Sequence, residues 1–206
     1  MLNKLKGLYV ITDDVLTPKD TMLQQVEKAL QGGAKIIQLR DKKNSDEDIE
    51  KEVIALQNLC RSYRALFILN DRVELAMKLQ CDGLHVGKSD YHRMKEIRTN
   101  FLGYLGVSCY GDIKKAKEME YLGVDYVAFG SFFASPTKPN AAVVNTNVIN
   151  EAKNILNIPI CAIGGITTKN VSKLIEQKVD MVAVISDIWK SENIILKCEE
   201  FKKQLG

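Results

Sequence analysis

The sequence predicts an α/β fold, namely a single-domain (β/α)8 TIM barrel over residues 1–206. Three observations lead to this prediction. Eight short runs of apolar and β-branched residues recur along the chain, and segments with helical periodicity separate them. The runs are apolar almost throughout, which is typical of parallel strands buried on both faces. No GxGxxG motif follows the first run, which favours a closed barrel over an open doubly wound sheet.

The predicted strands follow one another at regular spacing. In order they are "GLYVIT" (7–12), "KIIQLR" (35–40), "LFILN" (66–70), "GLHVG" (83–87), "YLGVS" (104–108), "YVAFG" (126–130), "PICAIG" (159–164) and "MVAVIS" (181–186). A weak internal repeat supports them, because "GGAKIIQL", "CDGLHVG", "YLGVDYVAFG" and "QKVDMVAVIS" each leave a helix, turn and enter a strand. Lys178 occupies the turn position where the other three segments carry Gly. A left-handed Lys there costs about 1 kcal/mol relative to Gly.

Two helices between or after the strands have recognisable starts. Ser45 can cap the segment "SDEDIEKEVIALQNLCRSY", with Asp48 three residues further on. Ser191 is the expected cap of the last segment, "SENIILKCEEFKKQLG". Both segments carry an apolar stripe at helical spacing, formed by Ile49, Val53, Leu56, Cys60 and Tyr63 in the first and by Ile194, Cys198, Phe201 and Leu205 in the second.

Composition excludes several classes of protein. The chain has 206 residues and a formal net charge of +3, with no basic tract, so we expect no nucleic-acid partner. The start "MLNKLKGLYVITDD" lacks an apolar stretch long enough for a signal peptide or a membrane span. The five cysteines are scattered without a CxxC pair, which indicates reduced thiols. We therefore expect a cytoplasmic protein that acts on small molecules. The sequence is compatible with a homo-oligomer and does not determine the oligomeric state.

Two acids follow neighbouring strands. Asp71 comes directly after the third predicted strand, and Asp90 closely follows the fourth. In a barrel both positions lie on the catalytic rim, at the carboxyl ends of the strands. Two carboxylates with few histidines nearby suit a hard cation, and Mg²⁺ commonly bridges such acids to substrate phosphates. The spacing fits equally well with a structural alternative, in which each Asp caps the helix that follows it.

Two further rim loops carry cations. After the second strand, in "QLRDKK", Arg40 and Lys42 alternate and would project to the same side. Opposite two acids they would suit a magnesium-bound diphosphate, although the two residues alone indicate only a surface charge cluster. The loop after the sixth strand, "GSFFASPTKPNAAV", is the longest strand-to-helix connection. Loops of this length are often functional, and this one offers the Ser135 and Thr137 hydroxyls and the Lys138 charge.

The last two rim loops and the histidines carry weaker signals. Barrels often bind a phosphate between the loops after strands seven and eight, here "IGGITTKN" and "ISDIWKS". Gly164 and Gly165 allow a close approach of the backbone, although a GG pair is equally a tight turn. We expect His85, within the fourth strand, to be a satisfied core histidine, and His92 to lie on a surface helix.

Taken together, these residues resemble the thiamine phosphate synthase family over essentially the whole chain. The resemblance depends on motifs that each end a strand and occur in order: "YVITD" (9–13), "QLRDK" (38–42), "NDR" (70–72), "DGLHVGKSD" (82–90), "GVS" (106–108), "DYVAFGSFFASPTK" (125–138), "AIGGI" (162–166) and "VAVIS" (182–186). It implies an enzyme that joins hydroxymethylpyrimidine diphosphate to thiazole phosphate. The products are thiamine phosphate and pyrophosphate.

The resemblance also assigns residues to this reaction. It implies that Asp71 and Asp90 hold Mg²⁺. The residues that it assigns to the pyrimidine diphosphate are Gln38, Leu39, Arg40, Asp41, Lys42, Asn70, Ser108 and Lys138. Of these, Arg40, Lys42 and Lys138 would neutralise the departing diphosphate as a pyrimidine cation forms. The residues that it assigns to the thiazole phosphate are Ser135, Pro136, Thr137, Gly165, Ile185 and Ser186.

The chain departs from the family pattern at two positions. Lys88 stands where Gln is usual, and Ser135 stands where Thr is common.

Two other functions compete with the synthase. One alternative is a thiazole tautomerase, whose catalytic histidine would align near Tyr110, so a tyrosine there argues against it. The other is a catalytically silent sensor of phosphate ligands on the same barrel. The complete set of cations and acids argues against that reading, because a binder does not need leaving-group chemistry.

Overall fold

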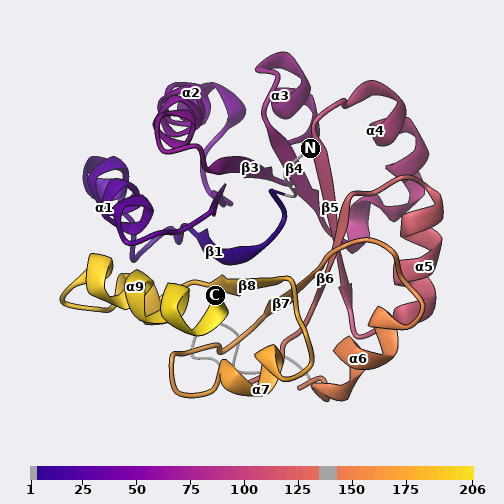
Figure 1. The fold of residues 1–206 in the computed structure, drawn as a ribbon. Coiled ribbons are helices and arrows are strands. Elements are labelled where there is room, and N and C mark those ends of the chain that lie inside the picture. Colours follow the sequence, from indigo (N-terminus) through magenta and orange to yellow (C-terminus); the bar gives the residue numbers. More distant parts are fainter. Residues whose placement is uncertain (1–3, 135–142) are drawn as a thin grey trace.

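The computed structural model describes residues 4–134 and 143–206, and its strands form one closed parallel barrel (Figure 1). All eight predicted strands are present, and the predicted TIM barrel is confirmed. The strands pair in chain order, and β8 pairs back with β1 through Val10 and Val184. Their bounds are β1 Gly7–Ile11, β2 Ile36–Leu39, β3 Leu66–Asn70, β4 Gly83–Val86, β5 Tyr104–Tyr110, β6 Tyr126–Phe129, β7 Ile160–Ile163 and β8 Met181–Val184.

Helices surround the barrel as an outer ring (Figure 1). They are α1 Lys19–Gln31, α2 Asp46–Ser62, α3 Val73–Lys78, the 3₁₀ helix η1 Lys88–Arg93, α4 Met94–Asn100, α5 Ile113–Tyr121, α6 Asn147–Lys153, α7 Ser172–Ile175, α8 Ser186–Trp189 and α9 Ile194–Leu205. The C-terminal α9 packs beside α1 and β1, which joins the two ends of the fold. In the part of the chain that the structure describes, no helix is both long and apolar enough to span a bilayer.

The strands separate two apolar cores. Alternate side chains point inward, and the inner core contains Tyr9, Ile11, Ile36, Leu66, Ile68, Tyr126, Ala128, Cys161, Met181 and Ala183. The intervening side chains point outward and pack with the helices in a much larger outer core. This alternation decides which side chain at the end of a strand reaches the barrel mouth, because only the inward series continues into it.

The two predicted helix caps have different outcomes. Ser45 caps α2 as predicted, because its Oγ accepts a hydrogen bond from the Asp48 amide, and the Asp48 carboxylate bonds back to the Ser45 amide. The prediction for Ser191 is wrong, since α9 begins at Ile194 and its cap is Asn193, whose Oδ1 accepts from the Leu196 amide. Ser191 Oγ instead accepts from the Asn193 amide. It therefore orders the residue that makes the cap.

The repeated helix–turn–strand units do share left-handed turns, but not always at glycine. Gly33, Gly123 and Lys178 have φ values of 100°, 89° and 61°, so Lys178 is left-handed like the two glycines. In the "CDGLHVG" unit the left-handed residue is Gln80. Gly83 there opens β4, where an added Cβ would lie 2.3 Å from Ile68 Cδ1. The expectation of a turn glycine in that unit is therefore wrong, because inner-core packing requires this glycine.

The five cysteines are free thiols, as predicted, and all of them are buried. Burial raises the pKa of each thiol, to about 12 for Cys60 and Cys81. They are therefore inert core residues at neutral pH, because the thiolate is the reactive form.

Two reciprocal substitutions test the left-handed turns. We expect Lys178→Gly to raise the free energy of unfolding by about 0.5–1 kcal/mol, because a left-handed L-residue costs about 1–2 kcal/mol and Gly returns part of that in chain entropy. We expect Gly123→Ala to lower it by about 1–2 kcal/mol, since its Cβ would also lie 3.2 Å from Arg98 Cγ. Urea unfolding measures both. A lower stability for Lys178→Gly would show that the Lys178 side chain contributes more than its backbone costs.

Candidate active site at the carboxyl ends of the strands

Asp71 directly follows β3, at the carboxyl-end rim, in a strained backbone conformation. Its amide donates to the His85 carbonyl at 2.8 Å, which extends the pairing of β3 and β4 by one residue. Its φ is 62°, a left-handed value that is uncommon for a residue other than Gly. Lys42 Nζ lies 3.8 Å from Asp71 Oδ2, and a Cβ on Gly87 would lie 4.0 Å from Oδ1. The carboxylate therefore lies between the loop after β2 and the loop after β4.

Asp90 lies in that second loop, within η1. Its Oδ2 accepts a hydrogen bond of 2.8 Å from Ser89 Oγ. The neighbouring Tyr91 donates its hydroxyl to the Ser108 carbonyl at 2.6 Å, which fastens η1 to β5. The helices after both acids, α3 and α4, begin at Val73 and Met94 and have no side-chain cap in the described chain. The helix-cap alternative for Asp71 and Asp90 is therefore wrong.

The two carboxylates fit the way that proteins usually hold Mg²⁺. Among residues 4–134 and 143–206 no group of three or more His, Cys, Asp or Glu side chains surrounds a common point. Mg²⁺ does not need such a cage, since it is commonly bound by one or two carboxylates together with water and substrate phosphates. In the described structure the Asp71 carboxylate accepts no hydrogen bond, so its oxygen lone pairs are available.

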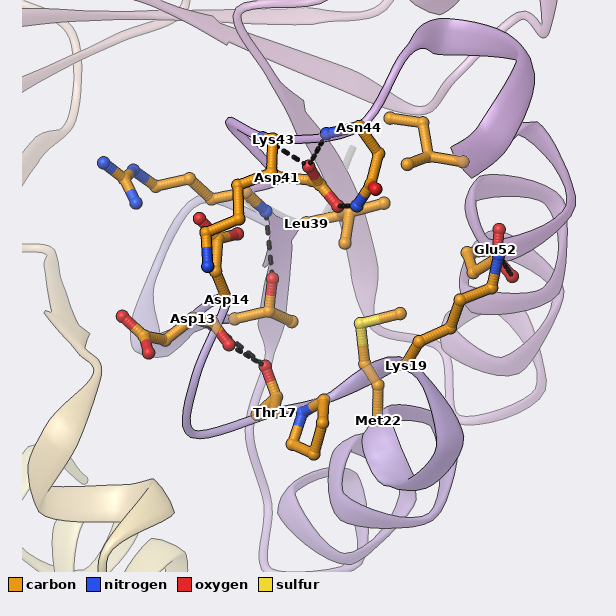
Figure 2. A pocket seen from close by; sticks show the side chains of 14 residues that line it. Asp13, Asp14, Thr17, Lys19, Met22, Leu39, Asp41, Lys43, Asn44 and Glu52 are labelled. Atoms are coloured by element: carbon orange, nitrogen blue, oxygen red, sulfur yellow. Dashed lines mark hydrogen bonds and ion pairs between the residues drawn. The ribbon is translucent and has the colours of Figure 1, made fainter.

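The loop between β2 and α2 presents the predicted cations. The Arg40 amide donates to Thr12 Oγ1 at 2.9 Å. Asp41 holds the turn that follows (Figure 2), because its carboxylate accepts from the amides of Lys43 and Asn44 and from Asn44 Nδ2. Burial alone would raise the pKa of Asp41, but these hydrogen bonds outweigh burial and lower it. The Asp41 side chain is thus engaged within the loop that carries Arg40 and Lys42.

Figure 2 shows the pocket behind this loop, a cavity of about 90 Å³ between the loops after β1 and β2. Met22, Leu39 and Ile49 line its apolar side. Leu39, a predicted pyrimidine-site residue, belongs to the outer core and does not point into the barrel. Any contact from Leu39 to a ligand in the barrel mouth would therefore involve its backbone.

Arg72 fastens the same loop to the turn after β3, and sequence reasoning missed it. Its guanidinium donates to Asp46 Oδ1 at 2.9 Å, to the Asp41 carbonyl at 3.1 Å and to the Asn44 carbonyl at 2.6 Å. Arg72 directly follows Asp71, so one turn positions both the acid and the cationic loop. The available signal was the position of Arg72 within "NDR".

Polar side chains occupy the inward series at the barrel mouth. Gln38 and Asn70 are 3% and 8% exposed, and Ser108 is half-buried on β5. His85 is a satisfied core histidine, as predicted, because Nδ1 bonds to the Tyr126 hydroxyl and Nε2 to Ser108 Oγ, each at 2.9 Å. Sequence reasoning missed Tyr126, although an inward-facing tyrosine within the apolar run "YVAFG" needs a polar partner when buried.

The paired glycines after β7 are required by the loop after β6. Gly164 and Gly165 have φ values of 103° and 62°. A Cβ on Gly165 would lie 2.5 Å from the carbonyl oxygens of Phe133 and Ala134. The loop that leads to the predicted residues Ser135, Pro136, Thr137 and Lys138 therefore crosses directly over Gly165. Those four residues lie outside the described part of the chain.

The loops after β7 and β8 are joined to each other and to β1. The Thr168 amide donates to Asp187 Oδ2 at 3.2 Å, and Trp189 Nε1 donates to the Ile11 carbonyl at 2.7 Å. Ile185 and Ser186, at the start of α8, are half-buried beside this junction. The structure thus places Gly165, Ile185 and Ser186 on adjacent rim loops.

Comparisons with known proteins show which family this chain resembles. The family model described as thiamine monophosphate synthase matches residues 8–188. The thiamine-phosphate synthase of Wolinella succinogenes is 44% identical over 90% of this chain and 86% of its own length. That of Acidithiobacillus ferrooxidans is 44% identical over 92% and 89%.

A solved structure agrees in fold as well as in sequence. The thiamine phosphate pyrophosphorylase from Pyrococcus furiosus superposes with a TM-score of 0.87 at 36% identity, and the match covers 98% of this chain and 96% of that one. With a family match across most of the barrel and relatives of this similarity, the chain belongs to the thiamine monophosphate synthase family.

Proposed function

We propose that this chain is a Mg²⁺-dependent thiamine phosphate synthase, a transferase that condenses hydroxymethylpyrimidine diphosphate with thiazole phosphate and releases pyrophosphate. One observation carries the proposal. The Asp71 carboxylate lies between Lys42 and the loop that holds Asp90, so an acid and a cation from the ends of adjacent strands lie together at the rim. A magnesium-bound diphosphate needs both kinds of group.

The chain's residues would act mainly on the leaving group. The pyrimidine methylene carbon can ionise because the ring amino group stabilises the cation, and negative charge then grows on the diphosphate. Arg40, Lys42 and Lys138 would neutralise that charge, which is electrostatic stabilisation aimed at the transition state. Bound Mg²⁺, held by Asp71 and Asp90, would supply further positive charge to the diphosphate. The thiazole nitrogen then attacks the cation, so the protein needs no nucleophile of its own.

The second substrate would bind on the opposite side of the rim. The backbone at Gly165 and the Ser186 hydroxyl would receive the thiazole phosphate together with Ser135, Pro136, Thr137 and Ile185. Support for this comes from the junction between Thr168 and Asp187, which joins the two loops. The two substrates would then approach each other across the barrel mouth.

The two alternative functions fit the site less well. A thiazole tautomerase would need its histidine near Tyr110, yet Tyr110 ends β5 with a left-handed φ of 61° and a 53% exposed side chain. A silent phosphate sensor would have no use for acids and cations placed around a leaving group.

A direct assay separates the three functions. We expect pyrophosphate release only when both substrates and Mg²⁺ are present. Isomerisation of a thiazole without pyrophosphate release, or binding without turnover, would refute the proposal.

The two aspartates provide the first mutational test. We expect Asp71→Asn and Asp90→Asn each to abolish most Mg²⁺-dependent turnover with little loss of stability, because neither carboxylate caps a helix in the structure. Initial rates across a Mg²⁺ titration and urea unfolding are the measurements. The control is Asp20→Asn, on the exposed start of α1. Wild-type rates at limiting Mg²⁺ in both variants would remove the metal site from the proposal.

Lys138 tests the leaving-group role. We expect Lys138→Ala to lower kcat by on the order of 10²–10³, with a smaller effect on binding of the pyrimidine diphosphate, because one charge-stabilising donor in such a site has that effect. Single-turnover kinetics and a separate binding measurement resolve the two quantities. Lys28→Ala, on the exposed side of α1, is the matched control. An unchanged chemical rate with weaker binding would make Lys138 a docking residue.

The accepting phosphate tests the second half of the site. We expect kcat/KM for the thiazole alcohol to be lower than for the thiazole phosphate by about 10²-fold or more, because hydrogen bonds to a charged group contribute about 1.5–3 kcal/mol each. Competing the two acceptors against a fixed concentration of pyrimidine diphosphate measures the ratio. Equal values would exclude a phosphate site at Gly165 and Ser186.

A further inference from the structure

We propose that Tyr9, Tyr126 and His85 are positioning residues, which fix Gln38 as a hydrogen-bond acceptor and Ser108 as a donor toward the pyrimidine ring. The site would thereby select a ring that carries both an amino group and an unprotonated ring nitrogen. This inference rests on the proposed function, because it concerns the pyrimidine substrate of the same site.

A continuous chain of hydrogen bonds crosses the barrel beneath its mouth. Gln38 Nε2 donates to the Tyr9 hydroxyl at 2.6 Å, and the Tyr9 and Tyr126 hydroxyls lie 3.0 Å apart. Tyr126 lies 2.9 Å from His85 Nδ1, and His85 Nε2 lies 2.9 Å from Ser108 Oγ. Both ends of the chain, Gln38 and Ser108, are residues expected to bind the pyrimidine. The three residues between them make no proposed contact with substrate.

The donor at the Gln38 end determines the direction of every proton. Tyr9 accepts from Gln38 Nε2, so its own proton must go to Tyr126, the other partner of its hydroxyl in the described structure. Tyr126 accepts from Tyr9 and therefore donates to His85 Nδ1. A neutral imidazole that accepts at Nδ1 carries its proton on Nε2 and donates it to Ser108 Oγ.

The surroundings of His85 support a neutral ring. The side chain is 8% exposed, and both ring nitrogens contact hydroxyl groups rather than carboxylates. Burial lowers the pKa of His85 to about 4. Burial also raises the pKa of Tyr9 and Tyr126 far above the neutral range, so neither tyrosine ionises. The chain of hydrogen bonds therefore consists of neutral groups. Its direction depends only on the tautomer of His85 and on the rotamers of the hydroxyl groups.

The two free ends are chemically different as a result. In the described residues Gln38 Oε1 accepts no hydrogen bond, and the Ser108 proton has no acceptor. Gln38 thus offers a carbonyl and Ser108 offers a hydroxyl proton. An amino group on a pyrimidine donates, and an unprotonated ring nitrogen accepts, so an aminopyrimidine complements both ends. A pyrimidine with a carbonyl in place of the amino group would set two acceptors against each other at Gln38.

Nitrogen-15 NMR of the histidines tests the direction without any substrate. The protein contains two histidines, His85 and His92, so selective labelling of histidine gives few signals. At pH 7 we expect His85 to be neutral with the proton fixed on Nε2. His92, which is exposed, serves as the internal control and should average between tautomers. A proton on His85 Nδ1, or a charged ring, would overturn the proposal. This result does not depend on whether the protein is a synthase.

Kinetics of hydroxyl-deletion variants test the consequence. We expect Tyr126→Phe to raise KM for the pyrimidine diphosphate roughly ten-fold, as expected for one lost hydrogen bond, and to leave KM for the thiazole phosphate unchanged. The spectrum of His85 should lose its fixed tautomer. Tyr104→Phe is the matched control, since Tyr104 packs against the same inner core and its hydroxyl makes no hydrogen bond in the described structure. Tyr9→Phe, which breaks the chain one link earlier, should raise the same KM.

The outcomes separate this inference from the proposed function. Unchanged KM for the pyrimidine diphosphate in both Tyr126→Phe and Tyr9→Phe would overturn the inference while leaving an active synthase. An equal rise in KM for both substrates would show a general packing defect and would also overturn it. A wild-type protein without pyrophosphate release would refute the proposed function instead. If Tyr126→Phe does not fold, the wild-type tautomer and Tyr9→Phe decide the question.

Discussion

Closure of the barrel is the constraint on which the rest of this structure depends. Because β8 pairs with β1, none of the eight described strands has a free edge, and every side chain on these strands must point either inward or toward the helices. Gln38 and Leu39 show the consequence, since adjacent residues of β2 belong to opposite sides. A shift of one residue in the register would exchange them. It would also remove an amide from the mouth of the barrel.

The interior of the barrel changes from apolar to polar toward its carboxyl end. Ile36, Leu66 and Met181 fill the lower part, while Gln38, His85 and Ser108 lie nearer the mouth. A buried polar group costs stability unless it is hydrogen-bonded. The chain of bonds through Tyr9 and Tyr126 meets this requirement. The groups of the polar layer are therefore hydrogen-bonded to one another and still present a defined direction.

Left-handed residues other than glycine lie at both ends of the barrel strands. The left-handed residues Arg64, Gln80 and Lys178 lie in turns that enter strands, where they allow short connections. Asp71 and Tyr110 are left-handed at the opposite, carboxyl ends of strands. Strain of this kind persists only where neighbours hold the backbone in place. At Asp71 the bond from its amide to the His85 carbonyl does so, and the guanidinium of the next residue, Arg72, holds the facing loop.

The sequence by itself determined the eight strands, the capping box at Ser45 and the rim positions of Arg40, Asp71 and Asp90. These follow from local patterns, because strand periodicity, capping and the end of an apolar run involve residues close together in the chain. The Asn193 cap and the bonds of the Asp41 carboxylate within its own loop are also local contacts, which the sequence prediction missed because Ser, Asn and Asp all suit caps and turns. Only the tertiary structure joined Tyr9 to Tyr126, which are 117 positions apart. No local pattern can specify such a pair, since the contact exists only once the barrel has closed.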